Sequence, residues 1–376
     1  MLLLAAGFYA CHKVDKPEEP DDGISEMVMK VKGCPRPTGI YNVGTFYFYV
    51  RSTDFVSVDW GDRTPIDTMT LLIDYNQFHH VYSDTSVVYI VKITGTNITN
   101  LYIPAGDYFN FDTAPPNGYL MHLDVSKNTM LASLGCGYNR LTSLDLGKNS
   151  ALAELECEFN RLTSLDVSGC TALTYIHCNS NKIKILDVSK NTALYQLRCD
   201  SNQLKSLDLS KNTELHYLDC SRNQLTSLDI SKNTALTGLL CGVNQLTSLN
   251  TTNNTKLGYL NCSRNQLTNL DLSKNMELGY LYCEYNQLTS FDAANNTKLG
   301  YLNCSHNQLT SLDLSKNIWL TFLEIKDNVF PAEALNDLFE TLQSNVGSGN
   351  YINIGSNPGS YDCDKSIAEN KGWMVY

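Results

Sequence analysis

A unit of 21 residues recurs along most of the chain without a single insertion. Its consensus is LxxLxCxxNxLTSLDLSKNTx, in which a half-unit of the form LxxLx(C/L)xxN occurs twice. The ten full units begin at Leu131, Leu152, Leu173, Leu194, Leu215, Leu236, Leu257, Leu278, Leu299 and Leu320. One unit is too short to bury its apolar side alone and must bury it against its neighbours. The period therefore predicts a continuous stack of coils.

Cysteine occupies an inward position of this unit, because leucine and cysteine alternate with polar residues as in an extended segment. A buried cysteine behaves as a small apolar side chain, so we expect a column of free thiols in the core. Metal binding is disfavoured, since the chain has no CxxC pair and no histidine in register. The column comprises Cys136, Cys157, Cys178, Cys199, Cys220, Cys241, Cys262, Cys283 and Cys304. Cys34 and Cys363 lie outside it, and their pairing is left open.

Three polar columns share the same period. An inward amide can donate and accept, so each asparagine is expected to tie one turn to the next. The first column is Asn139, Asn160, Asn181, Asn202, Asn223, Asn244, Asn265, Asn286, Asn307 and Asn328. The second is Asn128, Asn149, Asn191, Asn212, Asn233, Asn254, Asn275, Asn296 and Asn317, with Cys170 in the missing position. The third is acidic: Asp124, Asp145, Asp166, Asp187, Asp208, Asp229, Asp271, Asp292 and Asp313. It is expected to alternate with lysines in a solvated lattice; calcium binding is the alternative, but each half-unit lacks a second acidic ligand.

The half-unit resembles the repeat of leucine-rich repeat proteins, and the resemblance covers well over half of the chain. It implies a mainly β fold with repeat architecture, a curved solenoid of about eleven 21-residue coils. The nearest architecture is that of internalin-like proteins, which bind protein partners through the concave, strand-lined face. The half-unit LTSLDLSKNT hardly varies, whereas LxxLxCxxN varies at its outward positions. Variation of this kind favours a surface specialised for a partner.

The variable half-unit carries many aromatic residues, which we expect to form a ligand-binding surface. Tyrosine offers contact area at little entropic cost to a protein partner; its flat ring also suits a sugar, so a glycan remains the alternative ligand. Stacking of neighbouring rings to stabilise the sheet is a structural explanation that is compatible with either. The predicted ligand-binding residues are Tyr175, Tyr217, Tyr259, Tyr280, Tyr282, Tyr285, Tyr301 and Phe322.

Glu154, Glu156 and Glu158 alternate along one segment, so their side chains project to one side. A carboxylate pair is what glycoside hydrolysis needs, but nothing in the sequence indicates an enclosed pocket. A solvated acidic patch is expected, with cation binding and catalysis as weaker alternatives. The sequence has no HExxH, GxSxG or phosphate-loop motif and predicts neither a cofactor nor a metal. A formal charge of −11 and a pI of about 5.1 exclude a nucleic-acid partner.

The first eleven residues, MLLLAAGFYAC, form a short apolar run that ends in Ala-Cys. This run resembles the lipobox of bacterial lipoproteins, with residues 1–11 as the signal peptide and Cys11 as the lipidated residue. Residues 12–27 are acidic and contain proline, which predicts a flexible tether. An acidic run behind the lipidated cysteine resembles export signals of Bacteroidetes surface lipoproteins. Together they imply an outer-membrane, cell-surface location with membrane contact only through the lipid anchor.

Residues 28–95 contain β-rich segments between turn signals. VDWGDRTP followed by HHVYSD and VVYIVKITG resembles a PKD-type β-sandwich, and the matching residues are Trp60, Gly61, Asp62, His80, Tyr82, Tyr89 and Val91. A generic N-terminal β cap is the alternative. The leucine-rich repeat domain is assigned to 96–328. Residues 329–376 are predicted to form a C-terminal cap, with a helix that begins at Pro331 and carries an apolar stripe. The ending resembles the caps of Bacteroidetes leucine-rich repeat proteins.

Overall fold

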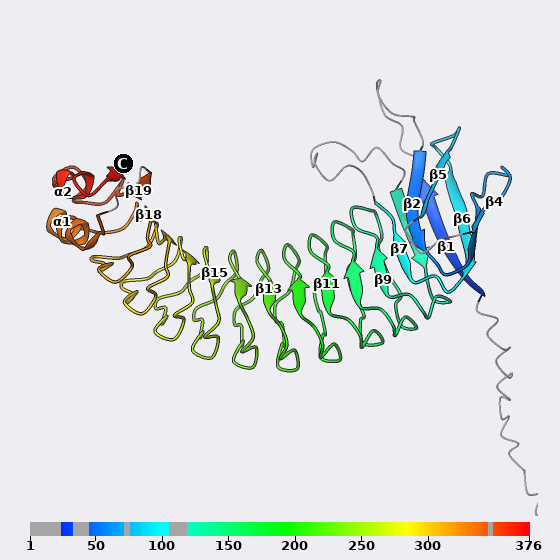
Figure 1. Ribbon diagram of the computed structural model, residues 1–376, viewed down its shortest axis with the longest axis horizontal. Helices are drawn as coiled ribbons and strands as arrows, with labels where there is room; N and C mark the ends of the chain where they lie inside the picture. The colour runs from blue at the N-terminus through cyan, green and yellow to red at the C-terminus, as the bar shows by residue number, and fades with distance from the viewer. Residues whose placement is uncertain (1–23, 33–44, 71–75, 105–118, 345–348) are drawn as a thin grey trace, which may run out of the picture.

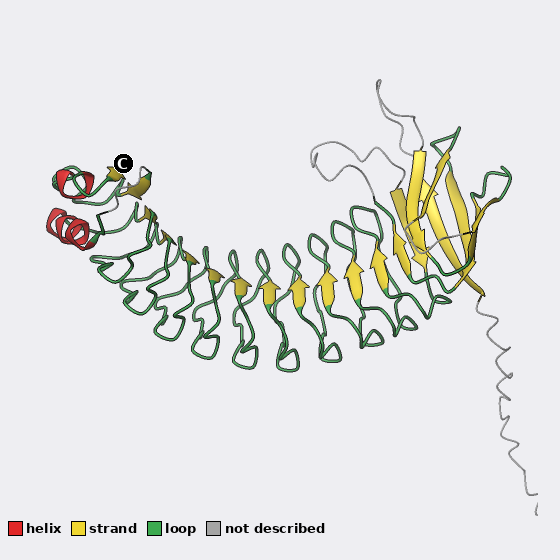
Figure 2. Cartoon of the chain, viewed as in Figure 1, coloured by secondary structure: helices red, strands yellow, loops and turns green. Residues whose placement is uncertain are grey.

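The computed structural model describes residues 24–32, 45–70, 76–104, 119–344 and 349–376. Figure 1 shows the coils stacked into an arc, with a group of longer strands at the N-terminal end and two helices at the C-terminal end. Figure 2 shows one short strand in each coil, joined by loops. The predicted mainly β solenoid is confirmed.

Each coil contributes one three-residue strand, and neighbouring strands pair in parallel with no register shift. The strands are β9 (Ser133–Gly135), β10 (Glu154–Glu156), β11 (Tyr175–His177), β12 (Gln196–Arg198), β13 (Tyr217–Asp219), β14 (Gly238–Leu240), β15 (Tyr259–Asn261), β16 (Tyr280–Tyr282), β17 (Tyr301–Asn303) and β18 (Phe322–Glu324). Because the pairing is in register, equivalent residues of successive coils lie side by side.

The core is a column of leucines with the predicted thiol column beside it. All nine ladder cysteines, from Cys136 to Cys304, are fully buried and free. Cys170 is also buried, and its thiol donates to the Leu146 carbonyl at 3.4 Å. Cys363 is half-buried and free, whereas Cys34 lies outside the described residues. Burial raises the pKa of these thiols, for example that of Cys178 to about 12, so they stay protonated at neutral pH.

The two asparagine columns make different hydrogen bonds. In the first column the side chain both accepts and donates: Asn223 Oδ1 accepts from Leu204 N–H at 2.9 Å, and its Nδ2 donates to the Cys199 carbonyl at 3.0 Å. In the second column the amide mainly donates, as Asn233 does to the carbonyls of Leu209 and Asn212. Both columns join adjacent coils, as predicted.

The aspartate column is held mainly by hydrogen bonds within each turn. Each aspartate Oδ1 accepts a hydrogen bond from the backbone N–H two residues later, for example from Ser210 to Asp208 at 2.9 Å. Among the described residues no aspartate of this column lies within ion-pair distance of a lysine. Hydrogen bonds from this turn, with the charge of the lysine three residues later as a smaller effect, lower the pKa of Asp187, Asp208 and Asp229. The aspartates and lysines therefore alternate in solvent, as predicted, but without direct ion pairs. No group of metal-ligating side chains is found within the described ranges.

The N-terminal region consists of two sheets that continue into the solenoid. Its strands are β1 (Ile24–Lys32), β2 (Thr45–Arg51), β3 (Phe55–Asp59), β4 (Asp67–Thr70), β5 (Asn76–Val81), β6 (Val88–Thr96), β7 (Asn100–Tyr102) and β8 (Tyr119–Asp124). The first sheet has the order β4-β3-β6-β1-β8, and the second begins β5-β2-β7 and runs on through β9. β1 begins inside the segment 12–27 that was expected to be a tether.

The C-terminal cap completes the stack. It contains α1 (Ala332–Thr341), β19 (Asn350–Asn353), α2 (Ser366–Glu369) and β20 (Trp373–Val375). The predicted apolar stripe of α1 is confirmed, with Leu335, Leu338 and Phe339 buried. β19 pairs in parallel with β18, and Asn357 donates to the Ile325 carbonyl at 3.0 Å. The cap therefore includes one further coil that continues the first asparagine column. Within the described parts of the chain, no helix is long and apolar enough to cross a membrane.

Candidate ligand-binding face

The outward side chains of the solenoid strands form a continuous surface, here called the strand face. It consists of the first and third residue of each strand, because the middle residue points into the core. In-register pairing places Tyr259, Tyr280 and Tyr301 next to one another in one line, and Asn261, Tyr282 and Asn303 in a parallel line. The strand face is therefore built by the repeat itself.

Seven rings form a connected row on the C-terminal part of this face, which we call the ring row. Tyr282 lies between Tyr259 and Tyr301, with ring centroids 5.5 and 4.6 Å away. Tyr301 stacks on Phe322 at 4.3 Å with an interplanar angle of 4°. The contacts continue into the cap at 4.8 and 5.1 Å. The members are Tyr259, Tyr280, Tyr282, Tyr301, Phe322, Tyr351 and Tyr376.

Tyr280 and Tyr301 differ in how much of each ring is free. Tyr280 is 53% exposed, and its nearest ring centroids lie 6.0 and 6.5 Å away. Tyr301 is only partly exposed and has a ring close on both sides. Burial, together with the neighbouring Tyr282, raises the pKa of Tyr259 to about 12 and also raises that of Tyr301. These hydroxyls remain protonated and able to donate at neutral pH. The row thus stabilises the sheet and still displays rings.

The other predicted aromatic residues lie apart from the ring row. Tyr175 contacts Tyr195 at 5.8 Å, and Tyr195 stacks on His216 at 4.3 Å. The ring of Tyr217 packs over Gly238 of the next coil, where a Cβ added to the glycine would lie 2.9 Å from the ring. The coil of Gly238 therefore separates two aromatic groups. Tyr195 and His216 were missed because they precede the strand, where the alternation rule does not apply.

Tyr285 lies in the turn after β16 rather than on the strand face. Its backbone is left-handed, with φ of 56°. Its ring stacks on His306 at 3.9 Å, and the Arg264 guanidinium lies 4.0 Å above it. His306 in turn pairs with Asp327 at 3.3 Å. Tyr285 therefore belongs to a separate column of stacked side chains on the edge of the face.

The glutamate group on β10 is less solvated than the sequence suggested. Glu154 is exposed, but Glu158 leans over Gly137, where an added Cβ would lie 2.5 Å from its Oε1. Burial raises the pKa of Glu158 to about 7, and burial with nearby Glu154 raises that of Glu156. Burial against Gly137 of the preceding coil is therefore enough to raise the pKa of Glu158 without an enclosed pocket. His177 stands 3.9 Å from Glu156.

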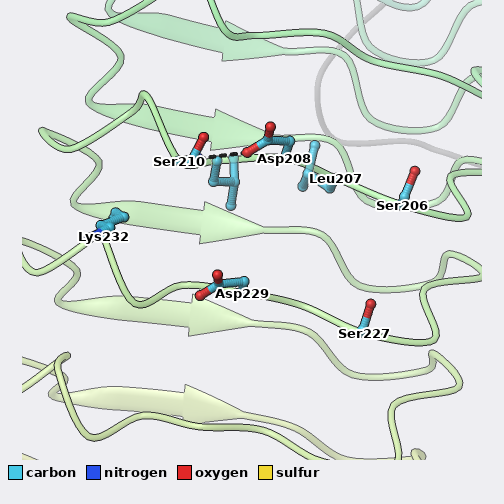
Figure 3. Close-up of a pocket in the computed structure, with 8 residues that line it drawn as sticks. Ser206, Leu207, Asp208, Ser210, Ser227, Asp229 and Lys232 are labelled. Atoms are coloured by element: carbon cyan, nitrogen blue, oxygen red, sulfur yellow. Dashed lines mark hydrogen bonds between the residues drawn. The ribbon is translucent and has the colours of Figure 1, made fainter.

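The described residues also enclose a groove of about 260 Å³ on the half of the coil opposite the strands. Figure 3 shows Asp208 and Asp229 on adjacent turns, with Ser210 close to Asp208. Asp208 is already held by Ser210 N–H. The groove is lined by the invariant half-unit, so it is the gap between two identical turns rather than a specialised site. Its lining residues are Ser206, Leu207, Asp208, Leu209, Ser210, Ser227, Asp229 and Lys232.

No protein-family model matches the chain, and no curated protein matches it. Several solved structures, however, are similar to this chain. The functional domain of InlJ from Listeria monocytogenes, described as including a cysteine ladder, is 29% identical with a TM-score of 0.51, over 75% of this chain and 74% of that one. The internalin InlF from Listeria monocytogenes is 23% identical with a TM-score of 0.58, over 69% and 78%.

A third similar structure comes from a plant. The leucine-rich repeat ectodomain of the receptor kinase GASSHO1/SCHENGEN3 from Arabidopsis thaliana was solved in complex with CASPARIAN STRIP INTEGRITY FACTOR 2. It is 27% identical with a TM-score of 0.53, over 62% of this chain and 31% of that one. The 21-residue coils, the thiol column and these likenesses together establish the fold: the chain is a leucine-rich repeat solenoid similar to the internalins.

Proposed function

We propose that this chain is a non-catalytic surface protein that binds a protein partner through the ring row of its strand face. The observation that carries the proposal is the unbroken line of contacting rings from Tyr259 to Tyr376. Aromatic side chains dominate interface energetics because they bring a large apolar area and lose few rotamers on binding. The similar plant ectodomain was solved in complex with CASPARIAN STRIP INTEGRITY FACTOR 2, which supports a protein ligand for this chain.

The first experiment uses Tyr280→Ala in the soluble chain. Tyr280 is the residue of choice because its ring is 53% exposed and has no close stacking partner. Loss of a central tyrosine from an interface costs about 2 kcal/mol, which is roughly a thirtyfold loss of affinity. Tyr361→Ala is the matched control, because Tyr361 is 96% exposed and lies in the cap outside the ring row.

A partner captured from cell-surface extracts should bind the native chain and the Tyr361→Ala chain equally, and the Tyr280→Ala chain at least tenfold more weakly. Equal binding by all three chains would remove the ring row from the proposal. If Tyr280→Ala instead lowers the melting temperature by several degrees, the row is structural. Tyr301→Ala is less informative, since Tyr301 is held between two rings and its loss also weakens the stack.

We also propose lipid anchoring at Cys11 and a PKD-type sandwich in front of the solenoid, in a Bacteroidetes outer-membrane protein. Cys11 lies outside the described residues. The sandwich proposal is supported by the packing of its motif: His80 Nε2 lies 2.7 Å from Asp62 Oδ2, the ring of His80 stacks on Trp60, and Tyr82 donates to the Trp60 carbonyl. Incorporation of labelled palmitate by the native chain, and its loss in Cys11→Ala, would support the anchor; labelling of both would refute it.

A glycan is the second candidate ligand, because glycines accompany three tyrosines of the row. Gly258, Gly279 and Gly300 each precede a ring-row tyrosine, and a Cβ at any of them would meet only ordinary contacts of 3.5–3.9 Å. Glycine is therefore not required there by packing, and its absence of a side chain leaves room for a flat ligand beside the rings. Specific binding on a glycan array that is lost in Tyr280→Ala would favour this candidate over a protein partner.

A further inference from the structure

The segment that follows the first asparagine column changes its charge along the stack. In five successive coils, from Gln224 to Thr310, its two outward residues are glutamine and threonine. In the four preceding coils, five of the eight equivalent positions carry cations instead. These cations are Arg140, Arg161, Lys182, Lys184 and Lys205, here called the basic strip. The basic strip is therefore a local departure from an otherwise uniform part of the repeat.

The backbone brings the members of the basic strip side by side. Arg161 N–H donates to the Leu141 carbonyl at 2.8 Å. In the next coil, Lys182 N–H donates to the Leu162 carbonyl, also at 2.8 Å. Equivalent Cα atoms of neighbouring coils therefore lie about 5 Å apart, as in a sheet. Leu162 and Ile183 are buried, so alternation turns the cations outward. These coils lie in the half of the arc next to the N-terminal strands (Figure 1).

Within the described ranges, no acidic residue pairs with the basic strip. None of its five members is part of an ion pair there. The Arg140 guanidinium instead lies 3.3 Å from the ring centroid of Tyr119. Like charges at neighbouring positions repel, so the stability of the fold does not account for the strip. The outward residues next to it are uncharged: Tyr138, Phe159, Ser180 and Ser201 precede it, and Ser143, Ser164, Ile185 and Ser206 follow it.

Two of these neighbours add exposed apolar surface to the strip. Ile185 is 80% exposed, at a position where the coils before and after it carry serine. On the other side of the strip, Phe159 is 39% exposed and stacks on Tyr138 at 4.5 Å. An exposed isoleucine in place of serine gains nothing from burial in the free protein. A ligand that matches this surface therefore combines negative charges with apolar faces.

The surroundings of the basic strip favour a narrow ligand. The aspartate column runs parallel to the strip, and its members Asp166 and Asp187 are exposed just beyond the serine positions. A membrane surface or a nucleic-acid duplex is wide enough to bring its own negative charge against these aspartates. A single polymer chain can follow the cations along the stack and avoid them. A pyranose residue is similar in length to the spacing of the coils, so a linear polysaccharide presents charges at a matching interval.

We propose that the basic strip binds an acidic polysaccharide. Its carboxylate or sulfate groups pair with the lysines and with the forked guanidinium of Arg161, while the apolar faces of its sugars contact Ile185 and Phe159. The strip lies on other coils than the ring row and takes a different class of ligand. The inference therefore goes beyond the proposed function and does not depend on it.

The repeat supplies the substitutions for the test. The strip variant combines Arg161→Gln, Lys182→Gln, Lys184→Thr and Lys205→Thr, which installs the residues that the later coils carry at the same positions. These residues already fit the fold in five coils, so the strip variant should melt no lower than the native chain. The control variant removes the same charge from exposed lysines of the invariant half-unit, by Lys190→Gln, Lys211→Gln, Lys232→Gln and Lys274→Gln.

Binding of the full chain to polygalacturonate and to heparin is measured at several salt concentrations, with neutral dextran as the uncharged polymer. We expect the native chain and the control variant to bind both acidic polymers alike and to ignore dextran. The strip variant should bind at least tenfold more weakly and should respond less to salt, because fewer ionic contacts remain to be screened. Ile185→Ser keeps every charge and should still weaken binding severalfold.

Four results would overturn the proposal: failure of the native chain to bind either acidic polymer, an equal loss in the strip and control variants, tighter binding to phosphatidylglycerol vesicles or single-stranded DNA than to the polysaccharides, or an Ile185→Ser chain that binds like the native one. Tyr280→Ala separates this site from the ring row. It should bind polygalacturonate normally, and a loss there would move the polysaccharide to the ring row and refute the strip. Capture of a protein partner tests the ring row by itself, so either site can fail alone.

Discussion

Replacement of asparagine by cysteine should lower the free energy of unfolding more in the first asparagine column than in the second. In Asn223→Cys, the Leu204 N–H loses the Asn223 Oδ1 acceptor and stays buried. The carbonyls of Cys199, Cys220 and Ser221 lose the amide donor, from distances of 3.0, 3.1 and 3.1 Å. An unpaired buried N–H costs about 1–3 kcal/mol, so with the lost donations we expect about 3 kcal/mol.

Asn233→Cys should be much milder, because Asn233 only donates and its Oδ1 is buried without a partner in the described structure. A thiol can take over one donation, as Cys170 does at the equivalent position of an earlier coil. Removal of the unsatisfied oxygen offsets part of the remaining loss. We expect a cost of about 1 kcal/mol or less. The difference also explains why cysteine replaces asparagine in the second column and never in the first.

Urea unfolding of both variants measures the difference, and hydrogen exchange at the Leu204 amide reports the broken contact directly. Gln224→Ala is the control, since Gln224 is the exposed amide next to Asn223. Asn223→Cys should lower the unfolding midpoint clearly more than Asn233→Cys and should speed exchange at Leu204. Equal midpoints for the two cysteine variants would show that the accepted hydrogen bond is not what distinguishes the columns.

Two further predictions follow from burial. A thiol reagent should modify Cys363 in the native chain well before the ladder cysteines, which should react only after unfolding in guanidinium; rapid labelling of most ladder thiols would contradict the stacked core. Glu158 has a folded pKa of about 7, above its unfolded value, so its ionised form destabilises the folded state and stability should fall as pH rises from about 5 to 8, by about 2 kcal/mol. Glu158→Gln should flatten that fall, and an unchanged pH profile would contradict it.

The solenoid could be predicted almost completely from the sequence, because every coil repeats the same burial pattern. The period alone places Leu155, Cys157 and Asn160 in the core, where the structure has them. The ring row was predicted only in part. Tyr351 pairs in register with Phe322, but α1 lengthens that coil and the 21-residue spacing no longer marks the position. Tyr376 can be assigned to the ring row only when β20 is known to pair with β19.

Glu158 and Tyr217 pack differently from the prediction. Alternation along a strand predicts which side of the sheet a side chain occupies, but not the direction in which the side chain leans along the stack. Glu158 tilts onto Gly137 of the preceding coil, and that glycine makes the tilt sterically possible. Tyr217 tilts the other way, onto Gly238. Both contacts join residues one coil apart, so they depend on a pair of positions that no single repeat reveals.

The motif did not reveal how the N-terminal two-sheet region joins the solenoid. Its residues resemble those of an independent domain, but β2 pairs with β7 and β7 with β9, so one sheet runs from this region into the solenoid. The other sheet reaches the repeats through β8, which pairs with β1. The two-sheet region therefore covers the first coil in the way that the helical cap covers the last, and this contact stabilises the stack.

The same period that stacks the leucines in the core also aligns the rings on the strand face, so the two sets of side chains lie on opposite sides of each strand. Tyr280 can change without loss of core contacts, because its ring projects away from the leucines and touches other rings only at 6.0 and 6.5 Å. Tyr301 is different, since its ring stacks on Phe322 at 4.3 Å and lies 4.6 Å from the ring of Tyr282. If the ring row binds a partner as proposed, Tyr280 can change with little effect on the fold, whereas a change at Tyr301 alters the stack and the proposed ligand surface together.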